Sequence, residues 1–496
     1  MTKKTEVKAD NEKELIEMDE AIKLLKSSRP TFYRWVRTGK ITGMKVGRQW
    51  RFYKEDIERF LKGEAPRIAL TADIKPLIKI LAAQIKELGG KLPESEHRGG
   101  VEEAVLLTIA LGALLKASDI HITSDSIQNR ALIRYRLSGM LKEFAAFDLR
   151  LVPAVIARWK TLAACSTLET RKPQDGKFVA ELPGGRLDLR VSFLPAFPEE
   201  SVTVRILDSL AIKIHLDEMP FEPEFLNKLK RALQISYGMI IVSGPSGSGK
   251  TTTLYGCLNK VAKPELKVVS VEDPVEYILP GVTQVQVDHK AGMNFPYLLR
   301  AVLRSDPDVI MVGELRDHET LEMAQQAALT GHLVLTTLHT DEAAAALLRL
   351  KEMTGNDMVA ADSTKYLVAQ RIIRRLCPFC SKKDNVDPSR IEFLSDLARK
   401  GNTASKSLQN YFKKPVGCPK CHNTGFKGRI VVAEILEVTP EIIDKGLRKN
   451  AGIKEIREIG VRQGMITLLS QGIAKAAKGE TTIEEVRRTL AENLLF

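Results

Sequence analysis

The residues that decide the fold read MIIVSGPSGSGKT, at positions 239–251. The apolar run 239–243 predicts a buried strand, and residues 244–251 fit the pattern GxxxxGK(S/T) of a phosphate-binding loop. Glycines in such a loop let backbone N–H groups turn toward phosphate oxygens at the start of a helix, which we expect to begin at Thr251. The predicted nucleotide-binding residues are Gly244, Pro245, Ser246, Gly247, Ser248, Gly249, Lys250, Thr251 and Thr252.

Three further apolar runs, 268–272, 309–313 and 333–337, are separated by helical patterns. This alternation is typical of a parallel α/β sheet with buried strands. Carboxylates stand at or after the ends of two of these runs: Glu272, Asp273, Glu276 and Glu314. Because such a cluster beside a P-loop calls for a cation or a water to activate, we expect these acids near Mg²⁺, which the Thr251 hydroxyl would coordinate.

Four motifs follow one another in this region: GPSGSGKTTTLY (244–255), VEDPVEY (271–277), LLRAVLRSDPDVIMVGELRDHET (298–320) and TGHLVLTTLHT (330–340). They resemble the Walker A, Asp box, Walker B and His box of the ATPases that drive type II secretion and type IV pilus assembly. The resemblance extends over residues 101–496. It implies a RecA-like P-loop ATPase core that uses ATP and Mg²⁺.

The resemblance also implies roles for single residues. Lys250 matches the phosphate-binding lysine, Glu276 the acid that activates the attacking water, and Glu314 the Walker B acid. His332 and His339 match the His box, with which the family senses the phosphate state or couples neighbouring subunits. For either histidine alone, a hydrogen-bonded residue at the edge of the sheet is the plainer interpretation.

A helical pattern from Val101, followed by strand-like stretches up to residue 207, predicts an α+β domain before the core. Its motif LDLRVS (187–192) resembles the corresponding domain of the same ATPases. There Arg190 and Arg205 match arginines that reach the γ-phosphate. A guanidinium is suited to this role because its fork of donors stabilises charge on a transferring phosphoryl group.

Four cysteines form two CxxC pairs: Cys377, Cys380, Cys418 and Cys421. Two such turns that face each other supply four thiolates, the set that Zn²⁺ prefers in closed structural sites. A redox CxxC and four unrelated buried cysteines are the alternatives. Some assembly ATPases of the family carry a tetracysteine element, so the resemblance favours zinc and an assembly or export motor.

Residues 17–63 predict three short helices and a hairpin around Gly47, and residues 21–62 carry a net charge of +9. The motifs MDEAIKLL (18–25) and RPTFYRW (29–35) resemble the small winged helix-turn-helix of excisionases and MerR-like regulators. Bound to DNA, such a module would use Arg29, Thr31, Tyr33, Arg34, Arg48 and Arg51. The alternative is a fold reused to dock a protein, since these ATPases more often carry a different N-terminal docking domain.

These patterns predict six segments. They are a helix-turn-helix domain (1–64), a linker with one helix (65–100), the α+β domain (101–208), the RecA-like ATPase domain (209–376), a tetracysteine zinc subdomain (377–425) and a mainly helical C-terminal subdomain (426–496).

The chain has 496 residues, 44% of them hydrophobic and 28% charged, and a net charge of +13. This usage excludes a fibrous or disordered protein. The longest apolar stretch, 104–115, is shorter than the ~20 residues that span a membrane, and the charged N-terminus lacks the apolar part of a signal peptide. We therefore expect a cytoplasmic protein.

The resemblance then implies a homohexameric motor at the inner face of the cytoplasmic membrane. It would couple ATP hydrolysis to assembly of a type IV pilus or a type II secretion pseudopilus, together with an inner-membrane platform protein. The competing hypotheses are a DNA-binding regulator or DNA-uptake factor whose ATPase acts as a switch, and a nucleic-acid translocase.

Overall fold

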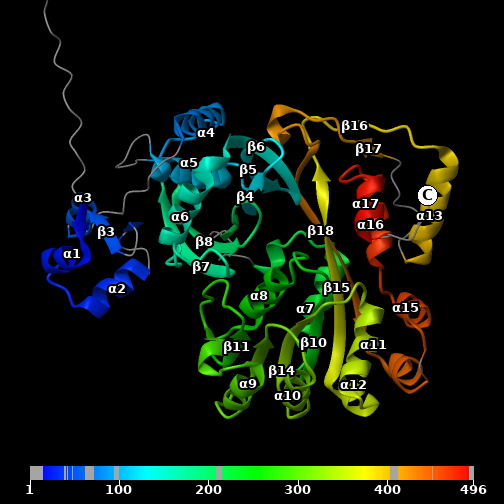
Figure 1. Ribbon diagram of the computed structural model, residues 1–496. Coiled ribbons are helices and arrows are strands. Elements are labelled where there is room, and N and C mark those ends of the chain that lie inside the picture. Colours follow the sequence, from blue (N-terminus) through cyan, green and yellow to red (C-terminus); the bar gives the residue numbers. More distant parts are fainter. Residues whose placement is uncertain are drawn as a thin grey trace, which may run out of the picture. The chain divides into compact units, whose positions relative to one another are not determined.

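The computed structural model describes residues 15–37, 41, 43–46, 49–61, 72–93, 100–207, 215–402, 411–449 and 451–490 (Figure 1). It divides into two compact units, Met1–Ser209 and Leu210–Phe496. Among the described helices, none combines the length and the apolar character that crossing a membrane requires.

The N-terminal module is a three-stranded antiparallel sheet with three helices. Its strand order is β1-β3-β2, and β2 and β3 form the predicted hairpin. Phe32, Phe52 and Ile57 are buried at its centre, where the two phenyl rings lie 5.1 Å apart. The three predicted helices are confirmed, and β1 is an additional strand. The elements are β1 (Leu15–Glu17), α1 (Met18–Leu24), α2 (Arg29–Arg37), β2 (Met44–Val46), β3 (Gln49–Tyr53) and α3 (Lys54–Leu61).

The α+β domain is built on a six-stranded antiparallel sheet in the order β6-β5-β4-β9-β8-β7. Its largest buried side chains include Trp159 and Tyr135, which belong to one continuous apolar core. The elements are α4 (Lys75–Glu87), α5 (Val101–Leu114), β4 (Asp119–Asp125), β5 (Arg130–Leu137), β6 (Met140–Asp148), α6 (Val152–Leu162), β7 (Gln174–Leu182), β8 (Gly185–Leu194) and β9 (Ser201–Leu207).

The helix predicted within the linker region 65–100 is present as α4, but it packs on the α+β domain. α4 places Leu77, Leu81 and Ile85 in the core of the α+β domain, where they pack with α5. The side-chain amide of Gln84 also donates a 2.8 Å hydrogen bond to the backbone oxygen of Phe144 on β6. Glycine and proline around the helix are typical of a tether, but the buried apolar face makes α4 part of the domain.

The second unit contains a seven-stranded sheet in the order β12-β11-β13-β14-β10-β15-β18. The first six strands are parallel, and β18 is antiparallel to β15. The four predicted strands are confirmed as β10, β11, β13 and β14, each buried along its whole length. Because these four strands are parallel, their carboxyl ends lie at one edge of the sheet, the usual ligand-binding edge of such folds.

The elements up to the end of this parallel part are α7 (Pro223–Ala232), β10 (Gly238–Ser243), α8 (Lys250–Val261), β11 (Val268–Glu272), β12 (Val282–Gln286), α9 (Phe295–Leu303), β13 (Val309–Val312), α10 (His318–Leu329), β14 (Leu333–Leu338), α11 (Ala343–Thr354), α12 (Asp357–Ser363) and β15 (Thr364–Leu376).

The tetracysteine segment joins β15 to β18 (Phe426–Glu437), the two long strands at one side of the sheet (Figure 1). Leu376 pairs with Phe426, so the segment lies at the tip of a long hairpin. β18 therefore belongs to the ATPase sheet and not to the helical region predicted to begin at residue 426. The remaining elements are β16 (Lys382–Lys383), α13 (Pro388–Lys400), β17 (Lys413–Lys414), α14 (Pro440–Ile442), the π-helix Ile443–Arg448, α15 (Ile453–Arg462), α16 (Leu468–Ala477) and α17 (Ile483–Leu490).

Candidate functional site

The P-loop runs from the end of β10 to the start of α8 and depends on glycines with positive φ. The angle is +150° at Gly244, +77° at Gly247 and +87° at Gly249. A Cβ at Gly244 would also lie only 2.6 Å from the backbone oxygen of Gln370. Side chains rarely adopt such φ values, so backbone geometry sets the glycine spacing of the motif.

Lys250 is the first residue of α8, one position earlier than the predicted start of the helix. Its Nζ donates hydrogen bonds to the loop carbonyls of Gly244, at 2.7 Å, and Pro245, at 3.1 Å. Burial lowers the pKa of Lys250, whereas the nearby Glu314 carboxylate acts to raise it. A cation held over this loop at a helix N-terminus is suited to bind phosphate.

Gln370 on β15 braces the P-loop from the neighbouring strand. Its Nε2 donates a 2.6 Å hydrogen bond to the backbone oxygen of Ser248, and its Oε1 accepts one of 2.8 Å from the Thr253 hydroxyl. Next to it, Arg371 donates to the backbone and side-chain oxygens of Asp341, both at 2.8 Å. Sequence analysis missed Gln370 because no motif marks it, and β15 itself was not predicted.

The acids at and just after the carboxyl end of β11 have different surroundings. Glu272 is buried, and three donors contact its carboxylate: the hydroxyls of Tyr255 and Ser270 and Nε2 of Gln284. The Tyr255 oxygen in turn accepts a 3.2 Å hydrogen bond from the backbone N–H of Glu276. Asp273 contacts Nε2 of His289 at 3.0 Å. Glu272 and Tyr255 therefore hold the loop that presents Glu276.

Glu314 follows β13, and His339 follows β14, at the same edge as the P-loop. Nε2 of His339 lies 3.4 Å from Glu314 Oε2, and Arg316 contacts the other carboxylate oxygen. The hydrogen bond to Glu314 raises the pKa of Arg316. The structure thus brings together the residues predicted as the Walker B acid and the second His-box histidine.

His332 lies at the opposite edge of the sheet, which corrects its assignment to the catalytic group. It precedes β14, whereas His339 follows that six-residue strand, so the two are about 20 Å apart along the sheet. Its Nδ1 contacts the backbone oxygen of Ala327 at 2.8 Å and the Thr330 hydroxyl at 3.2 Å. These contacts hold the turn between α10 and β14.

Arg190 and Arg205 are directly opposite each other on β8 and β9, the neighbouring strands that the sequence predicts. Nε of Arg205 contacts Oδ1 of Asp119 at 3.2 Å, and Arg136 contacts the other oxygen of Asp119 at 3.4 Å. The Arg205 side chain is nevertheless 67% exposed. Both arginines lie in the first unit, in the α+β domain.

The four cysteines of the two CxxC pairs converge, with all four sulfur atoms within 4.8 Å of one another. The Sγ–Sγ distances are 3.9 Å for Cys377–Cys418, 3.8 Å for Cys380–Cys421 and 3.7 Å for Cys418–Cys421. Tetrahedral zinc with Zn–S bonds of about 2.3 Å requires about 3.8 Å between sulfurs. The geometry therefore fits zinc.

Backbone N–H groups contact two of the four sulfur atoms and support the thiolate form of Cys421. Gly425 and Cys418 donate to Sγ of Cys421 at 3.3 and 3.2 Å, and Gly417 donates to Sγ of Cys380 at 3.4 Å. Burial acts to raise the pKa of Cys421, but the backbone N–H groups of Cys418 and Gly425, together with the thiols of Cys418 and Cys380, outweigh it and lower the pKa to about 6. Burial raises the pKa of Cys380 to about 11, although the Gly417 N–H acts to lower it. Thiolates are the ligand form, so the donors favour metal binding.

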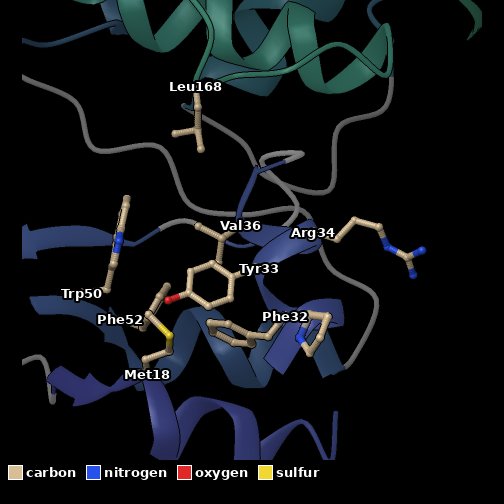
Figure 2. A pocket seen from close by; sticks show the side chains of 9 residues that line it. Met18, Phe32, Tyr33, Arg34, Val36, Trp50, Phe52 and Leu168 are labelled. Carbon is tan, nitrogen blue, oxygen red and sulfur yellow. The ribbon is translucent and has the colours of Figure 1, made fainter. Parts of the chain in front are cut away.

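The predicted DNA-contacting residues lie on α2 and β3 of the N-terminal module, except Arg48, which is outside the described residues. Arg29 pairs with Asp19 at 3.1 Å, Arg51 pairs with Glu17, and the Thr31 hydroxyl bonds to that of Ser28. Figure 2 shows Tyr33 over an apolar pocket that Met18 and Phe52 also line; Arg34 lines the same pocket, and its side chain extends away from Tyr33. The exposed side of α2 thus carries both an aromatic ring and a cation.

Two family models match the chain. Residues 94–488 match the one described as type II/IV secretion system protein, and residues 16–65 match a helix-turn-helix domain.

Relatives of two kinds are similar over most of their length. The chain is 37% identical over 408 residues to the type II secretion system protein E of Pectobacterium carotovorum, covering 81% of this chain and 79% of the relative. It is 34% identical over 439 residues to the type IV pilus assembly ATPase PilB of Myxococcus xanthus, covering 87% and 75%. Among solved structures, the ATPase DotB of Yersinia pseudotuberculosis has a TM-score of 0.59 at 20% identity, covering 81% of this chain and 98% of that one. The last similarity supports the RecA-like fold.

Proposed function

Because the chain belongs to the type II/IV secretion system protein family, whose model covers residues 94–488, we propose that it is the motor ATPase of a type IV pilus or a type II secretion pseudopilus. It is a P-loop ATPase, and the family match favours a motor over a DNA-binding regulator. The observation that carries the proposal is the convergence of four segments at one sheet edge: the P-loop, the loop that presents Glu276, Glu314 and His339.

Each segment has a role in hydrolysis. Lys250 would contact the β- and γ-phosphates, and the Thr251 hydroxyl and Glu314 would hold Mg²⁺, which neutralises phosphate charge when bound. Glu276 would accept a proton from the attacking water, while Tyr255 keeps its loop in place. His339, in contact with Glu314, would report the state of the γ-phosphate to the loop after β14.

The proposal also covers the oligomeric state, the membrane partner, the two arginines and the zinc site. The motor would be a homohexamer at the cytoplasmic face of the membrane, working against a platform protein. Arg190 and Arg205 would reach the γ-phosphate of a neighbouring subunit, and Zn²⁺ would crosslink the tip of the β15–β18 hairpin through the four cysteines.

ATP hydrolysis by the purified full-length chain tests the core of the proposal. Lys250→Ala should abolish Mg²⁺-dependent turnover, and Glu276→Gln should keep ATP binding while lowering kcat by about 10²–10⁴-fold, because an amide cannot accept the proton. Glu265→Gln, the same change just before the amino end of β11, is the matched control. Normal turnover in Glu276→Gln would refute the assignment of the base.

A further inference from the structure

The loop between β14 and α11 carries His339 and is held by charged side chains from distant parts of the second unit. Arg371 on β15 donates hydrogen bonds to the backbone oxygen and the carboxylate of Asp341, both at 2.8 Å. Glu434 on β18 accepts the backbone N–H of Ala343, also at 2.8 Å. Because β15 and β18 belong to the same sheet as β14, these contacts fix the loop to the body of the ATPase domain.

Glu342 extends the contacts of this loop beyond the sheet. It is the N-cap residue of α11, but its side chain caps no N–H group among the described residues. Its two oxygens instead accept hydrogen bonds from Nε and Nη2 of Arg457 on α15, at 2.7 and 2.8 Å. Arg457 lies 115 residues further along the chain, outside the four motifs of the ATPase core. Such a bidentate pair fixes the orientation of the carboxylate as well as its distance.

Arg457 also compensates two neighbouring carboxylates. Burial is the main cause that raises the pKa of Glu434, the charge of Glu342 acts in the same direction, and the charge of Arg457 opposes both. Without Arg457, the two acids would share the end of the loop with no counter-charge from α15. The Arg457 and Glu342 side chains are 41% and 24% exposed. Since ion pairs that contact solvent contribute little to stability, the main effect of this pair is on the geometry of the loop.

We propose that Arg457 is a positioning residue for ATP hydrolysis, which acts through Glu342 on the loop that carries His339. Two residues separate His339 from Glu342 in the chain. Nε2 of His339 lies 3.4 Å from Glu314 Oε2, so a small displacement of the loop breaks their contact. The proposal rests on the function proposed above, in which Glu314 holds Mg²⁺, and it adds α15 to the elements that set the geometry of the site.

The experiment is steady-state ATP hydrolysis by the full chain and by Arg457→Gln. We expect kcat to fall by about 10- to 100-fold, the loss that a displacement of about 1 Å causes at a reacting group. KM for ATP should stay nearly constant, because Gln370 braces the P-loop independently. Arg457→Lys should retain more of kcat than Arg457→Gln, since lysine keeps the charge but lacks the bidentate geometry.

Arg462→Gln is the matched control. Arg462 lies on the same helix, and its ion pair with Glu441, at 2.8 Å, does not involve the loop after β14. This variant should leave kcat and KM unchanged. Glu342→Gln breaks the proposed contact from the side of the loop, so it should reproduce the fall in kcat and replaces Arg457→Gln if circular dichroism shows that the latter does not fold.

Two double variants separate positioning from a loss of stability. In the His339→Ala chain, Arg457→Gln should lower kcat little further, because its effect passes through that histidine. Glu342→Gln with Arg457→Gln should lower kcat no more than Arg457→Gln alone, because the double change leaves no unpaired charge. Effects that multiply in both double variants would overturn the proposal, and so would an equal loss in Arg462→Gln.

The positioning role and the proposed function fail in different ways. Normal kcat in Arg457→Gln, in a chain whose turnover Lys250→Ala abolishes, would overturn the positioning role and leave the ATPase function standing. No ATP hydrolysis by the natural chain would refute both. A rise in KM for ATP with unchanged kcat would also overturn the positioning role, because it would assign Arg457 to nucleotide binding and not to the arrangement of the reacting groups.

Discussion

Gln370 donates a 2.6 Å hydrogen bond to the backbone oxygen of Ser248, so a strand far along the chain holds the phosphate loop. The same strand continues into Cys377 and the tetracysteine cluster. The long hairpin of β15 and β18 is therefore a direct structural link between the nucleotide site and the hairpin tip.

Removing the Gln370 side chain should loosen the P-loop without touching the reacting groups. Gln370→Ala leaves the buried hydroxyl of Thr253 and the Ser248 carbonyl without a partner, at a cost of about 1–3 kcal/mol. We expect KM for ATP to rise about 5- to 100-fold, with a smaller change in kcat, in steady-state kinetics. Gln325→Ala, which removes a buried hydrogen bond to Thr354 between α10 and α11, is the control. Equal effects of the two substitutions would show a general loss of stability.

Most of the parallel sheet could be predicted from the sequence because β10, β11, β13 and β14 are buried on both faces and are nearly all apolar. β15 escaped prediction because polar residues interrupt it. Two of them, Gln370 and Arg371, turn toward the P-loop and toward Asp341. A polar residue that contacts the P-loop from β15 interrupts the apolar pattern by which a buried strand is recognised in the sequence.

The other differences between the predicted and the observed structure depend on tertiary contacts. The sequence shows that α4 has an apolar face, but only the folded domain shows that Leu81 on this face is buried against α5. Similarly, two histidines of one motif flank β14, and the strand direction separates them. The spacing of a motif does not say which of its residues shares an edge with the P-loop.

The paired arginines should act between subunits. A double variant, Arg190→Ala with Arg205→Ala, and the single variant Lys250→Ala should each be inactive in ATP hydrolysis. If the arginines serve a neighbour, some sites in a mixed oligomer combine an intact P-loop with intact arginines, and mixing should restore part of the activity. A mixture as inactive as its components would place the arginines and the P-loop of one subunit together.

Zinc should be bound at one ion per chain. Because structural zinc contributes on the order of 10 kcal/mol to folding, Cys418→Ser should lower both the zinc content, by elemental analysis, and the thermal midpoint. Cys165→Ser, at a half-buried cysteine outside the cluster, should change neither by a comparable amount. Absence of metal from freshly purified protein would contradict the assignment.

Glu434 should make stability depend on pH. This buried carboxylate accepts the backbone N–H groups of Ala343 and Leu468, at the starts of α11 and α16. Burial raises its pKa to about 7 despite these bonds. The folded chain therefore binds the proton more tightly than the unfolded chain does. Glu434 therefore adds on the order of 3 kcal/mol to the free energy of unfolding at low pH. This contribution is fully present below about pH 4.5 and is lost as the pH rises through about 7.

Urea unfolding of the natural chain and of Glu434→Gln, between pH 5 and 8, measures this effect. As the pH rises, the free energy of unfolding of the natural chain should fall relative to that of Glu434→Gln, because glutamine does not titrate. Glu342 and Arg457, which face the same carboxylate and form an ion pair, are present in both proteins. A difference that is constant with pH would exclude titration of Glu434.

The N-terminal module offers a test that separates DNA binding from protein docking. If α2 reads DNA, the affinity of the full chain for duplex DNA should fall with salt, with a log–log slope of about −0.9 per phosphate contacted. Arg34→Ala should relax sequence preference, because α2 would face the bases.

Since Glu17 pairs with Arg51 on the neighbouring strand, Glu17→Gln should release a cation and strengthen binding to all sequences. Lys382→Gln with Lys383→Gln, on β16 of the second unit, should leave sequence preference unchanged. No binding at low salt, and no gain from Glu17→Gln, would leave docking of a protein as the role of the module.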